Sequence, residues 1–530
     1  MRAAVHRPAR LFSAGADATI ARTNRLFIDN EYVDAEDSAT LSVLSPETGA
    51  ELTTISHASA ADVDRAVGSA RACFDNSAWS TSPVEERAAI LRRVADTIRE
   101  RSAELAEIET RDCGKPLGES EADIGFCADM FEYYADTAPT ALADTPLKVP
   151  AGEGAGDDFV AKVRHEAMGV VGAITPWNFP LMQSVVKVAP ALAAGCAVVL
   201  KPSPLASLTS LALGEIVAAA GAAPGALNVI TGGPPETLGE GGSDSTGQHL
   251  IDHPMLDKIS FTGSGVAGQR MLESSAPHLR PTSLELGGKS AVVVFADAAE
   301  EHLDALIDWI MVGIFVCTGQ VCSATSRLIV HKDIEPLVTE RLLAAARTIS
   351  VGDPMADGTQ MGPAISQAQR DKVTTALRHA ETEGCIVHSA PLDLPPELAS
   401  GFFTPPTILT NVGEGTAAWQ EEIFGPVLAI RSFETEDEAV RAANDTPYGL
   451  ANAVFSADTA RCARVSAALR SGVVWENCSQ VLFPDTPFGG RAGKKSGFTA
   501  EYGYPGLEEY VSKKTVVSAT TPGYSWGWYN

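Results

Sequence analysis

Short apolar runs alternate with longer segments of helical periodicity through the middle of this chain. The runs contain four or five residues, and Gly, Pro or polar residues bound them, as is typical of buried strands. The expected strands lie at 170–174, 197–200, 227–230 and 258–261, with expected helices between them at 185–192 and 205–220. Strands that alternate with helices predict a parallel sheet in a doubly wound α/β domain.

The alternation starts again after Gly287. The predicted strands of this second part are 291–295, 326–330, 427–433 and 472–475, and its predicted helices are 302–317 and 334–349. Nearer the N-terminus, residues 26–33 alternate like a strand hairpin, and 59–73, 83–112 and 122–138 have helical periodicity. We therefore expect more than one α/β unit, in agreement with a length of 530 residues that is too great for one hydrophobic core.

Composition and charge narrow the classes of partner. The formal net charge of −27 argues against binding to nucleic acid or to an anionic membrane surface. No uninterrupted apolar run reaches the roughly 18 residues that a membrane span needs. The nine cysteines form no CxxC pair, and the ten histidines show no ligand spacing such as HxxxH. We therefore expect reduced cysteines and no metal site.

The N-terminal segment admits two interpretations. Five arginines stand there among small residues, as in an organellar transit peptide: Arg2, Arg7, Arg10, Arg22 and Arg25. Asp17 and the short length favour instead a disordered tail at 1–24. A cytoplasmic protein is expected, with organellar import as the alternative.

Three short stretches carry residues suited to chemistry on a carbonyl group. Cys322 lies in a small loop between an apolar segment and a strand-like run, Asn178 follows the strand 170–174, and Glu285 precedes a Gly-Gly pair. A thiol nucleophile, an amide donor and a carboxylate base together suit acyl chemistry. Each residue taken alone also fits an ordinary role, as a buried thiol, a turn residue or a surface charge.

A nucleotide site is indicated at the turn after the strand 258–261. Gly263 and Ser264 open a helix there, and the exposed N–H groups of a helix start suit a pyrophosphate. The spacing is not GxGxxG, so a plain strand–turn–helix explains it equally well. Lys201, at the end of another strand, could reach a ribose hydroxyl.

Seven motifs, in the order in which that family has them, resemble the aldehyde dehydrogenase superfamily. They are Pro176–Pro180, Lys201–Ser203, Phe261–Ser264, Leu284–Ser290, Gly319–Cys322, Glu421–Pro426 and Pro487–Gly490, and the resemblance spans about residues 25 to 518. Within the superfamily the chain is most similar to the betaine-aldehyde and aminoaldehyde dehydrogenases, through Asp112–Leu117, Phe131–Asp136, Cys322–Arg327, Asn477–Gln480 and Trp526–Tyr529.

The resemblance implies the aldehyde dehydrogenase fold, an α/β fold with three parts. A Rossmann-like cofactor-binding domain is expected at 25–147 and 167–287, and a catalytic α/β domain at 288–487. Residues 148–166 and 488–530 would form the bridging elements of an oligomerisation arm and the tail. In the family such arms add strands to a neighbour's sheet, so a homodimer or homotetramer is expected.

The resemblance also implies a mechanism. Cys322 would attack a small-molecule aldehyde to form a thiohemiacetal, and the Asn178 amide and the backbone N–H of Cys322 would hold the oxyanion. Hydride transfer to NAD would leave a thioester, which Glu285 would hydrolyse as general base on a water molecule. The implied cofactor contacts are Trp177, Lys201, Ser203, Gly263, Ser264, Leu286, Glu422 and Phe424.

Pro204 departs from the family pattern, because many relatives carry Glu at this position. That carboxylate hydrogen-bonds the adenosine ribose and repels a 2′-phosphate. Its absence should let the protein use NADP as well, although NAD remains the expected cofactor.

The expected substrate pocket also differs from the family pattern. Phe179, Val186, Val316 and Phe488 stand where relatives place aromatic rings around a trimethylammonium group, and two of the four are Val here. Glu476 replaces an apolar residue and is expected either to pair with a substrate amine or to form an internal salt bridge. We therefore expect an aminoaldehyde or a bulkier apolar aldehyde rather than betaine aldehyde.

The expected entrance of this pocket also differs. Asp123 is kept, but Gly125 and Phe126 replace acids that relatives carry. The segment 490–501 is longer than usual before its Ser-Gly pair and lacks the family's Gly-Arg-Glu-Leu-Gly. A reshaped loop is expected beside the entrance.

Two alternatives use the same fold differently. The thioester could be passed to coenzyme A or belong to an esterase-like enzyme, although Glu285 favours release of a free acid. A catalytically idle scaffold is the other alternative, and the intact set of Asn178, Glu285, Cys322 and Glu422 argues against it.

Overall fold

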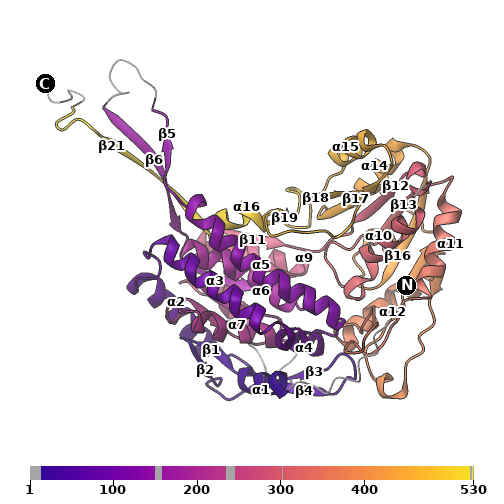
Figure 1. The fold of residues 1–530 in the computed structure, drawn as a ribbon, viewed down its shortest axis with the longest axis horizontal. Helices are drawn as coiled ribbons and strands as arrows, with labels where there is room; N and C mark the ends of the chain where they lie inside the picture. The colour runs from indigo at the N-terminus through magenta and orange to yellow at the C-terminus, as the bar shows by residue number, and fades with distance from the viewer. Residues whose placement is uncertain (1–13, 150–157, 234–244, 301, 526–527, 529–530) are drawn as a thin grey trace.

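Two seven-stranded sheets occupy the two halves of the molecule, and a narrow arm of three strands projects from one end (Figure 1). The computed structural model describes residues 14–149, 158–233, 245–300, 302–525 and 528. Within these ranges, no helix is both long and apolar enough to cross a membrane. The same ranges contain no group of three or more His, Cys, Asp or Glu residues that could hold a metal ion.

The first sheet is built from the short apolar runs of the first half of the chain. Its strand order is β11-β10-β7-β8-β9-β1-β2, and β7 to β11 are parallel. The strands are β7 (Val170–Ile174), β8 (Ala197–Lys201), β9 (Leu227–Val229), β10 (Lys258–Thr262) and β11 (Thr282–Glu285), with the antiparallel hairpin β1 (Leu26–Ile28) and β2 (Glu31–Val33) at one edge. Every residue of β7, β8 and β10 is buried, because helices cover both faces of a parallel sheet.

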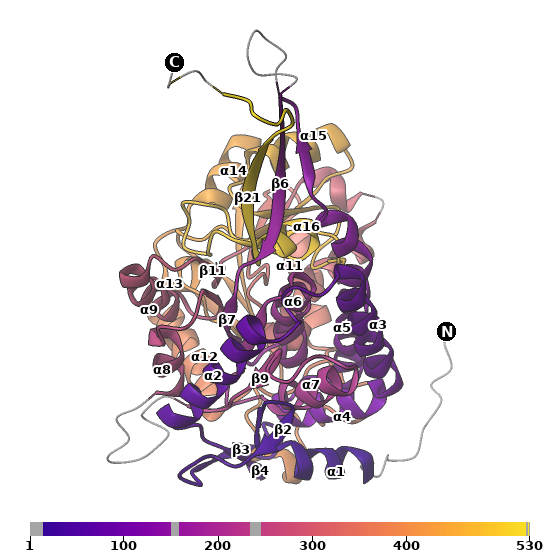
Figure 2. The ribbon, with the colours of Figure 1, turned by 90° about the vertical axis from the view of Figure 1, so that its left-hand side faces the viewer.

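Helices flank this sheet on both sides. Figure 2 shows α3, α5 and α6 on one side of β7 and α8 and α9 on the other. The helices are α2 (Ala60–Asn76), α3 (Val84–Glu100), α4 (Ser102–Cys113), α5 (Leu117–Ala141), α6 (Pro180–Ala194), α7 (Leu208–Ala219), α8 (Thr246–Asp252) and α9 (Gly265–Ser275). The single helix predicted at 83–112 is two helices, because Arg101 leaves the helical conformation (φ −100°, ψ 12°) between α3 and α4.

The second sheet has the strand order β14-β15-β16-β13-β12-β17-β18 and is parallel except for β14. Its strands are β12 (Ala291–Val294), β13 (Arg327–His331), β14 (Ile386–Ser389), β15 (Thr407–Thr410), β16 (Val427–Phe433), β17 (Ala451–Phe455) and β18 (Val473–Glu476). The helices around it are α10 (Leu303–Phe315), α11 (Glu335–Ala346), α12 (Gln367–Thr382), α13 (Ala417–Gln420), α14 (Glu436–Asn444) and α15 (Thr459–Ala468). The predicted α/β fold with two parallel sheets is confirmed.

The arm joins segments from the middle and the end of the chain. β6 (Phe159–Ala167) pairs along its whole length with β21 (Val511–Ala519) and on its other side with β5 (Thr145–Leu147). Short elements complete the fold: β3 (Thr40–Leu44), β4 (Glu51–Ser56), β19 (Phe488–Gly489), β20 (Ala500–Glu501) and α16 (Gly503–Glu508). β19 pairs with β20, so the segment 488–508 folds back beside the first sheet.

The prediction of a disordered tail at 1–24 is wrong for its second half. Residues 14–23 form α1 (Ala14–Thr23), which buries Ile20 and is anchored by two ion pairs. Asp17 lies 2.8 Å from Arg111, and Arg22 lies 2.8 Å from Glu215. Asp17 therefore attaches α1 to α4, and Arg22 attaches it to α7. Residues 1–13 and most of the motif Trp526–Tyr529 lie outside the described residues.

Candidate active site

A cavity of about 210 Å³ lies at the carboxyl edge of the first sheet, where the second half of the chain approaches it. The strand order reverses between β7 and β10, so the loops after these two strands diverge and leave a crevice. Loops of the second half and the start of α12 close the crevice from the other side. The cavity is lined by Pro176, Trp177, Asn178, Gln183, Thr262, Gly263, Ser264, Leu286, Gly287, Cys322, Gln369, Lys372, Glu422 and Phe424.

Cys322 is brought into this cavity by a break in helical structure. The helix predicted at 302–317 ends at Phe315, because Cys317 and Thr318 adopt left-handed φ values of 52° and 56°. The chain then turns away from α10, and the half-buried Cys322 thiol faces the cavity. Gly288 lies next to the loop of Cys322. A Cβ atom at position 288 would overlap the carbonyl oxygen of Cys322, so only glycine fits there.

Asn178 lies between β7 and α6 and is held against the loop of Cys322. Its Nδ2 donates a hydrogen bond to the backbone carbonyl of Gln320 at 2.8 Å, and its own backbone carbonyl accepts from the Cys317 thiol at 3.5 Å. The Asn178 side chain is 4 % exposed. The amide and the thiol, 144 residues apart in the numbering, therefore line the same small space.

Glu285 ends β11 next to this space, and its carboxylate is buried. Neither carboxylate oxygen makes a hydrogen bond of ordinary geometry within the described residues. Burial raises the pKa of Glu285 well above its usual range, and the negative charge of Glu501 raises it further, against the opposing charge of Lys187. Burial also raises the pKa of the Cys322 thiol, with Glu285 as the next cause, so the thiol is protonated in this state.

A buried ion pair stands behind Glu285, and sequence analysis did not include it in the site. Lys187 of α6 pairs with Glu501 of β20, and the Thr262 hydroxyl also donates to Glu501 at 3.4 Å. Both charged side chains are almost fully buried, at 1 % and 8 % exposure. The available signal for this pair was a single charged residue, Lys187, in a helix that has no other charged side chain.

The residues predicted to contact a cofactor divide into two groups. Six of the eight line the cavity: Trp177, Gly263, Ser264, Leu286, Glu422 and Phe424. The rings of Trp177 and Phe424 meet edge to face at 5.3 Å. One oxygen of Glu422 accepts a hydrogen bond from the Gly288 N–H at 2.9 Å. Burial raises the pKa of this carboxyl group.

Lys201 and Ser203 lie at the end of β8, beside the cavity lining rather than in it. Lys201 is 7 % exposed, and its Nζ donates to the carbonyl of Pro202 at 3.2 Å. Burial lowers the pKa of Lys201 to about 8. The Ser203 hydroxyl accepts from the Leu205 N–H at 3.3 Å, and Pro204 between them presents no carboxylate.

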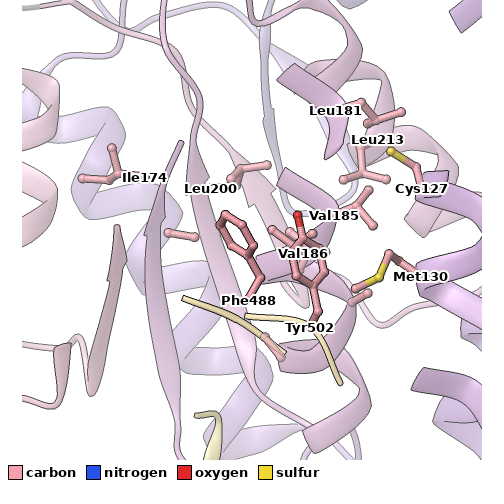
Figure 3. Packing of buried hydrophobic residues seen from close by; sticks show 14 of the residues in the cluster. Cys127, Met130, Ile174, Leu181, Val185, Val186, Leu200, Leu213, Phe488 and Tyr502 are labelled. Atoms are coloured by element: carbon pink, nitrogen blue, oxygen red, sulfur yellow. The ribbon is translucent and has the colours of Figure 1, made fainter. Parts of the chain in front are cut away.

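The five predicted pocket residues are only partly brought together. Val186 and Phe488 belong to one buried cluster, which also contains Tyr502 (Figure 3). The ring of Phe179 has the ammonium of Lys115 over it, 4.2 Å from the ring centroid. Val316, at the end of α10, is half-buried and lines a groove between α10 and α11.

Glu476 stands apart from that cluster. It is exposed at the end of β18, and its carboxylate accepts a hydrogen bond from the Ser466 hydroxyl of α15 at 2.6 Å. No cation in the described part of the chain lies within ion-pair distance of it. The structure places its carboxylate against a neighbouring helix, in neither of the two environments expected for it.

Comparisons with known proteins agree on one family. The model of the "Aldehyde dehydrogenase family" matches residues 32–516. Aminoaldehyde dehydrogenase 2 of Zea mays is 44 % identical over 509 residues, which are 95 % of this chain and 97 % of that protein. Betaine aldehyde dehydrogenase 1 of Oryza sativa is 43 % identical over the same shares of both chains. The crystal structure of betaine aldehyde dehydrogenase from Staphylococcus aureus in complex with NAD+ superimposes with a TM-score of 0.89 at 34 % identity, covering 98 % of this chain and 100 % of that one.

Proposed function

The chain belongs to the aldehyde dehydrogenase family, and we propose that Cys322, Asn178 and Glu285 carry its NAD-dependent oxidation of an aldehyde to the carboxylic acid. The observation that supports this assignment is their convergence. Asn178 and Cys322 line one cavity, and the charge of Glu285 acts on the Cys322 thiol. None of the relatives compared above bears the name of an acylating or structural protein, so those alternatives gain no support.

In the first step the sulfur of Cys322 bonds to the aldehyde carbon, and the thiol proton passes to the Glu285 carboxylate. The carbonyl oxygen becomes an oxyanion that needs hydrogen-bond donors where its charge develops. The Asn178 amide has two N–H groups, and only one is used by the carbonyl of Gln320. The second N–H and the backbone N–H of Cys322 are left for the oxyanion.

The chemistry that NAD supplies is acceptance of a hydride, which leaves Cys322 as a thioester. The cavity suits this cofactor, because it lies at the reversal of strand order where α/β sheets bind nucleotides. Glu422 has one carboxylate oxygen on the Gly288 N–H, and its second oxygen can accept from a ribose hydroxyl. Trp177 and Phe424 would pack beside the nicotinamide ring, and the start of α9 at Ser264 would face the pyrophosphate.

Glu285 completes the cycle by hydrolysis. Once it has released the proton taken from Cys322, its carboxylate accepts a proton from water, and the hydroxide attacks the thioester carbon. The carbon–sulfur bond breaks, and the acid leaves. A buried carboxylate with a raised pKa is a stronger base than an exposed one, so burial of Glu285 and the nearby charge of Glu501 serve this step.

We propose an aminoaldehyde as the substrate, with a bulkier apolar aldehyde as the second choice. The names of the maize and rice relatives support the first choice. We also propose the division into a cofactor-binding domain (25–147 and 167–287), a catalytic domain (288–487) and a bridging arm. The long arm strands β6 and β21 support a homodimer or homotetramer, which light scattering of the purified protein would distinguish.

A cytoplasmic location is proposed on the ground of the unpaired cysteines. Relatives named peroxisomal and chloroplastic, from Malus domestica and Arabidopsis thaliana, make organellar import the alternative. Microscopy of the full chain with a C-terminal fluorescent tag, with and without residues 1–13, would decide between them.

The test of the catalytic assignment is reduced-nicotinamide absorbance with purified protein, NAD and a panel of aminoalkyl, trimethylammonium, aliphatic and aromatic aldehydes. We expect Cys322→Ala to abolish turnover with every aldehyde. Cys385→Ala is the matched control, because Cys385 is a buried thiol near β14 and β15. Turnover that survives Cys322→Ala would refute the assignment.

A further inference from the structure

Tyr502 occupies an unusual place beside the candidate active site. It follows Glu501 directly, is 2 % exposed, and has a φ of 62°. A bulky residue seldom adopts a left-handed backbone, because its Cβ crowds the neighbouring carbonyl. The surrounding structure holds it there: the carbonyl of Tyr502 accepts from the Gly506 N–H at 2.9 Å, and the next carbonyl, of Gly503, accepts from the Tyr134 hydroxyl at 3.3 Å. Residues with strained backbone conformations are found most often at functional sites.

The ring of Tyr502 lies between two other aromatic rings. Its centroid is 5.8 Å from that of Phe488 and 5.7 Å from that of Phe126, both edge to face. In Figure 3 the ring packs with Phe488, and its hydroxyl oxygen points toward Val185 and Val186 of α6. The side chain of Tyr502 therefore fills the space that the small side chain of Val186 leaves beside it. Phe126, Phe488 and Tyr502 form a three-ring wall, which sequence analysis did not recognise.

The wall lies next to the reacting groups. Phe488 and Gly489 form β19, and a side chain at Gly489 would lie 2.9 Å from Glu285 Oε1. Burial raises the pKa of Tyr502 well above its usual range, and the charges of Glu501, Cys322 and Glu285 add to it. The hydroxyl is therefore neutral at any ordinary pH. No hydrogen bond joins it to another of the described residues, so its lone pairs and its proton are available to a bound molecule.

We propose that Tyr502 is a specificity-determining residue whose hydroxyl accepts a hydrogen bond from the terminal primary ammonium of an aminoaldehyde bound at Cys322. The proposal rests on the proposed function. Three ring faces attract any organic cation, whether a primary ammonium or a trimethylammonium. Only the primary ammonium has N–H donors, so the phenol oxygen is the group that distinguishes the two.

The charges nearby agree with a cationic group at this position. Glu285 and Glu501 are the carboxylates that act on Tyr502. Two buried lysines of this region already have partners: Lys187 is paired with Glu501, and Lys115 near Phe179 is paired with Asp123. An arriving ammonium therefore meets aromatic faces, a neutral oxygen and carboxylates rather than an unpaired lysine.

The test compares three aldehydes of equal chain length that end in a primary ammonium, a trimethylammonium or a methyl group. In Tyr502→Phe we expect the ratio of kcat/KM for the primary ammonium over the trimethylammonium aldehyde to fall about tenfold, as loss of a hydrogen bond to a charged group predicts. Tyr504→Phe is the matched control, because the Tyr504 side chain is 39 % exposed on α16. It should leave the ratio unchanged. An unchanged ratio in Tyr502→Phe would overturn the proposal.

A second measurement does not depend on turnover by the variant. Alkyl primary ammonium and alkyl trimethylammonium ions without an aldehyde should inhibit the wild-type enzyme competitively, and the primary ion should bind more tightly. Equal or reversed inhibition would count against the hydroxyl. Failure of the proposed function looks different, because wild-type protein would then oxidise none of the three aldehydes, or would oxidise them equally with Cys322→Ala.

Discussion

Lys187 of α6 and Glu501 of β20 are 314 residues apart in the chain and form a buried ion pair behind Glu285. The pair joins the first sheet's helix layer to the C-terminal segment that also carries Phe488 and Tyr502. Glu501 acts on Glu285 through its charge, so one interaction serves both packing and the basicity of the proposed general base.

The pH dependence of turnover should report this relationship. Glu501→Gln removes a negative charge that raises the pKa of Glu285, and it leaves the positive charge of Lys187 uncompensated. Both changes lower the pKa of Glu285, so the base is available at lower pH. The acid limb of the kcat profile should move down by about one pH unit. Glu508→Gln is the control and should not move this limb, because the half-buried Glu508 carboxylate pairs with the exposed Lys513 at 2.6 Å and is not among the charges that act on Glu285 most strongly.

The same substitution should also lower stability. A buried lysine that loses its ion-pair partner retains an uncompensated charge, which costs about 3 kcal/mol of unfolding free energy. Differential scanning calorimetry of Glu501→Gln beside Glu508→Gln would measure the difference. Equal transition temperatures for the two variants would show that the Lys187–Glu501 pair contributes no net stability.

Glu285→Gln should separate the two halves of the reaction. At high pH hydroxide can take the thiol proton in place of Glu285, so attack by Cys322 and hydride loss still occur there, while thioester hydrolysis lacks its positioned base. We expect one rapid burst of reduced nicotinamide per active site, followed by turnover that is about 100- to 10,000-fold slower. Intact-mass spectrometry should then find the acyl group on the protein. A variant that forms no burst and no adduct would contradict the assigned role.

Asn178→Ala tests the oxyanion donor. Loss of one preorganised donor typically lowers kcat about 100- to 1,000-fold. The alkylation rate of Cys322 by iodoacetamide is the companion measurement, because that reaction forms no oxyanion. We expect alkylation to continue at a rate near that of the wild type. A parallel collapse of both rates would mean that Asn178 acts by positioning the loop through Gln320.

Pro204→Glu tests cofactor choice. The wild type should use NADP as well as NAD, because no carboxylate stands at position 204 to repel a 2′-phosphate. With Glu at this position, KM for NADP should rise about five- to tenfold relative to KM for NAD. Initial rates with each dinucleotide at saturating aldehyde measure this ratio. If the ratio does not change, position 204 does not face the adenosine ribose.

Local sequence pattern was sufficient for the central strands of the first sheet and for the chemical groups, but it did not predict β11, β14, β15 and β17. The apolar runs at 170–174, 197–200 and 258–261 became central buried strands, because strands covered on both faces need apolar side chains at every position. The motifs around Asn178, Glu285 and Cys322 were also recognisable, since residue type and local spacing carry them. Their meeting in one cavity required the fold.

Tertiary structure decided everything that depends on partners distant in the sequence. Periodicity extended the helix to 317, but Cys317 and Thr318 adopt left-handed backbones that their own preferences disfavour. The Lys187–Glu501 pair and the ring of Tyr502 beside Val186 come from segments that only folding brings together. Glu476 was a candidate for the pocket until its strand placed it against Ser466. The physical reason is common to all of these cases: charge pairing and packing depend on three-dimensional distance, whereas a sequence pattern records only neighbours along the chain.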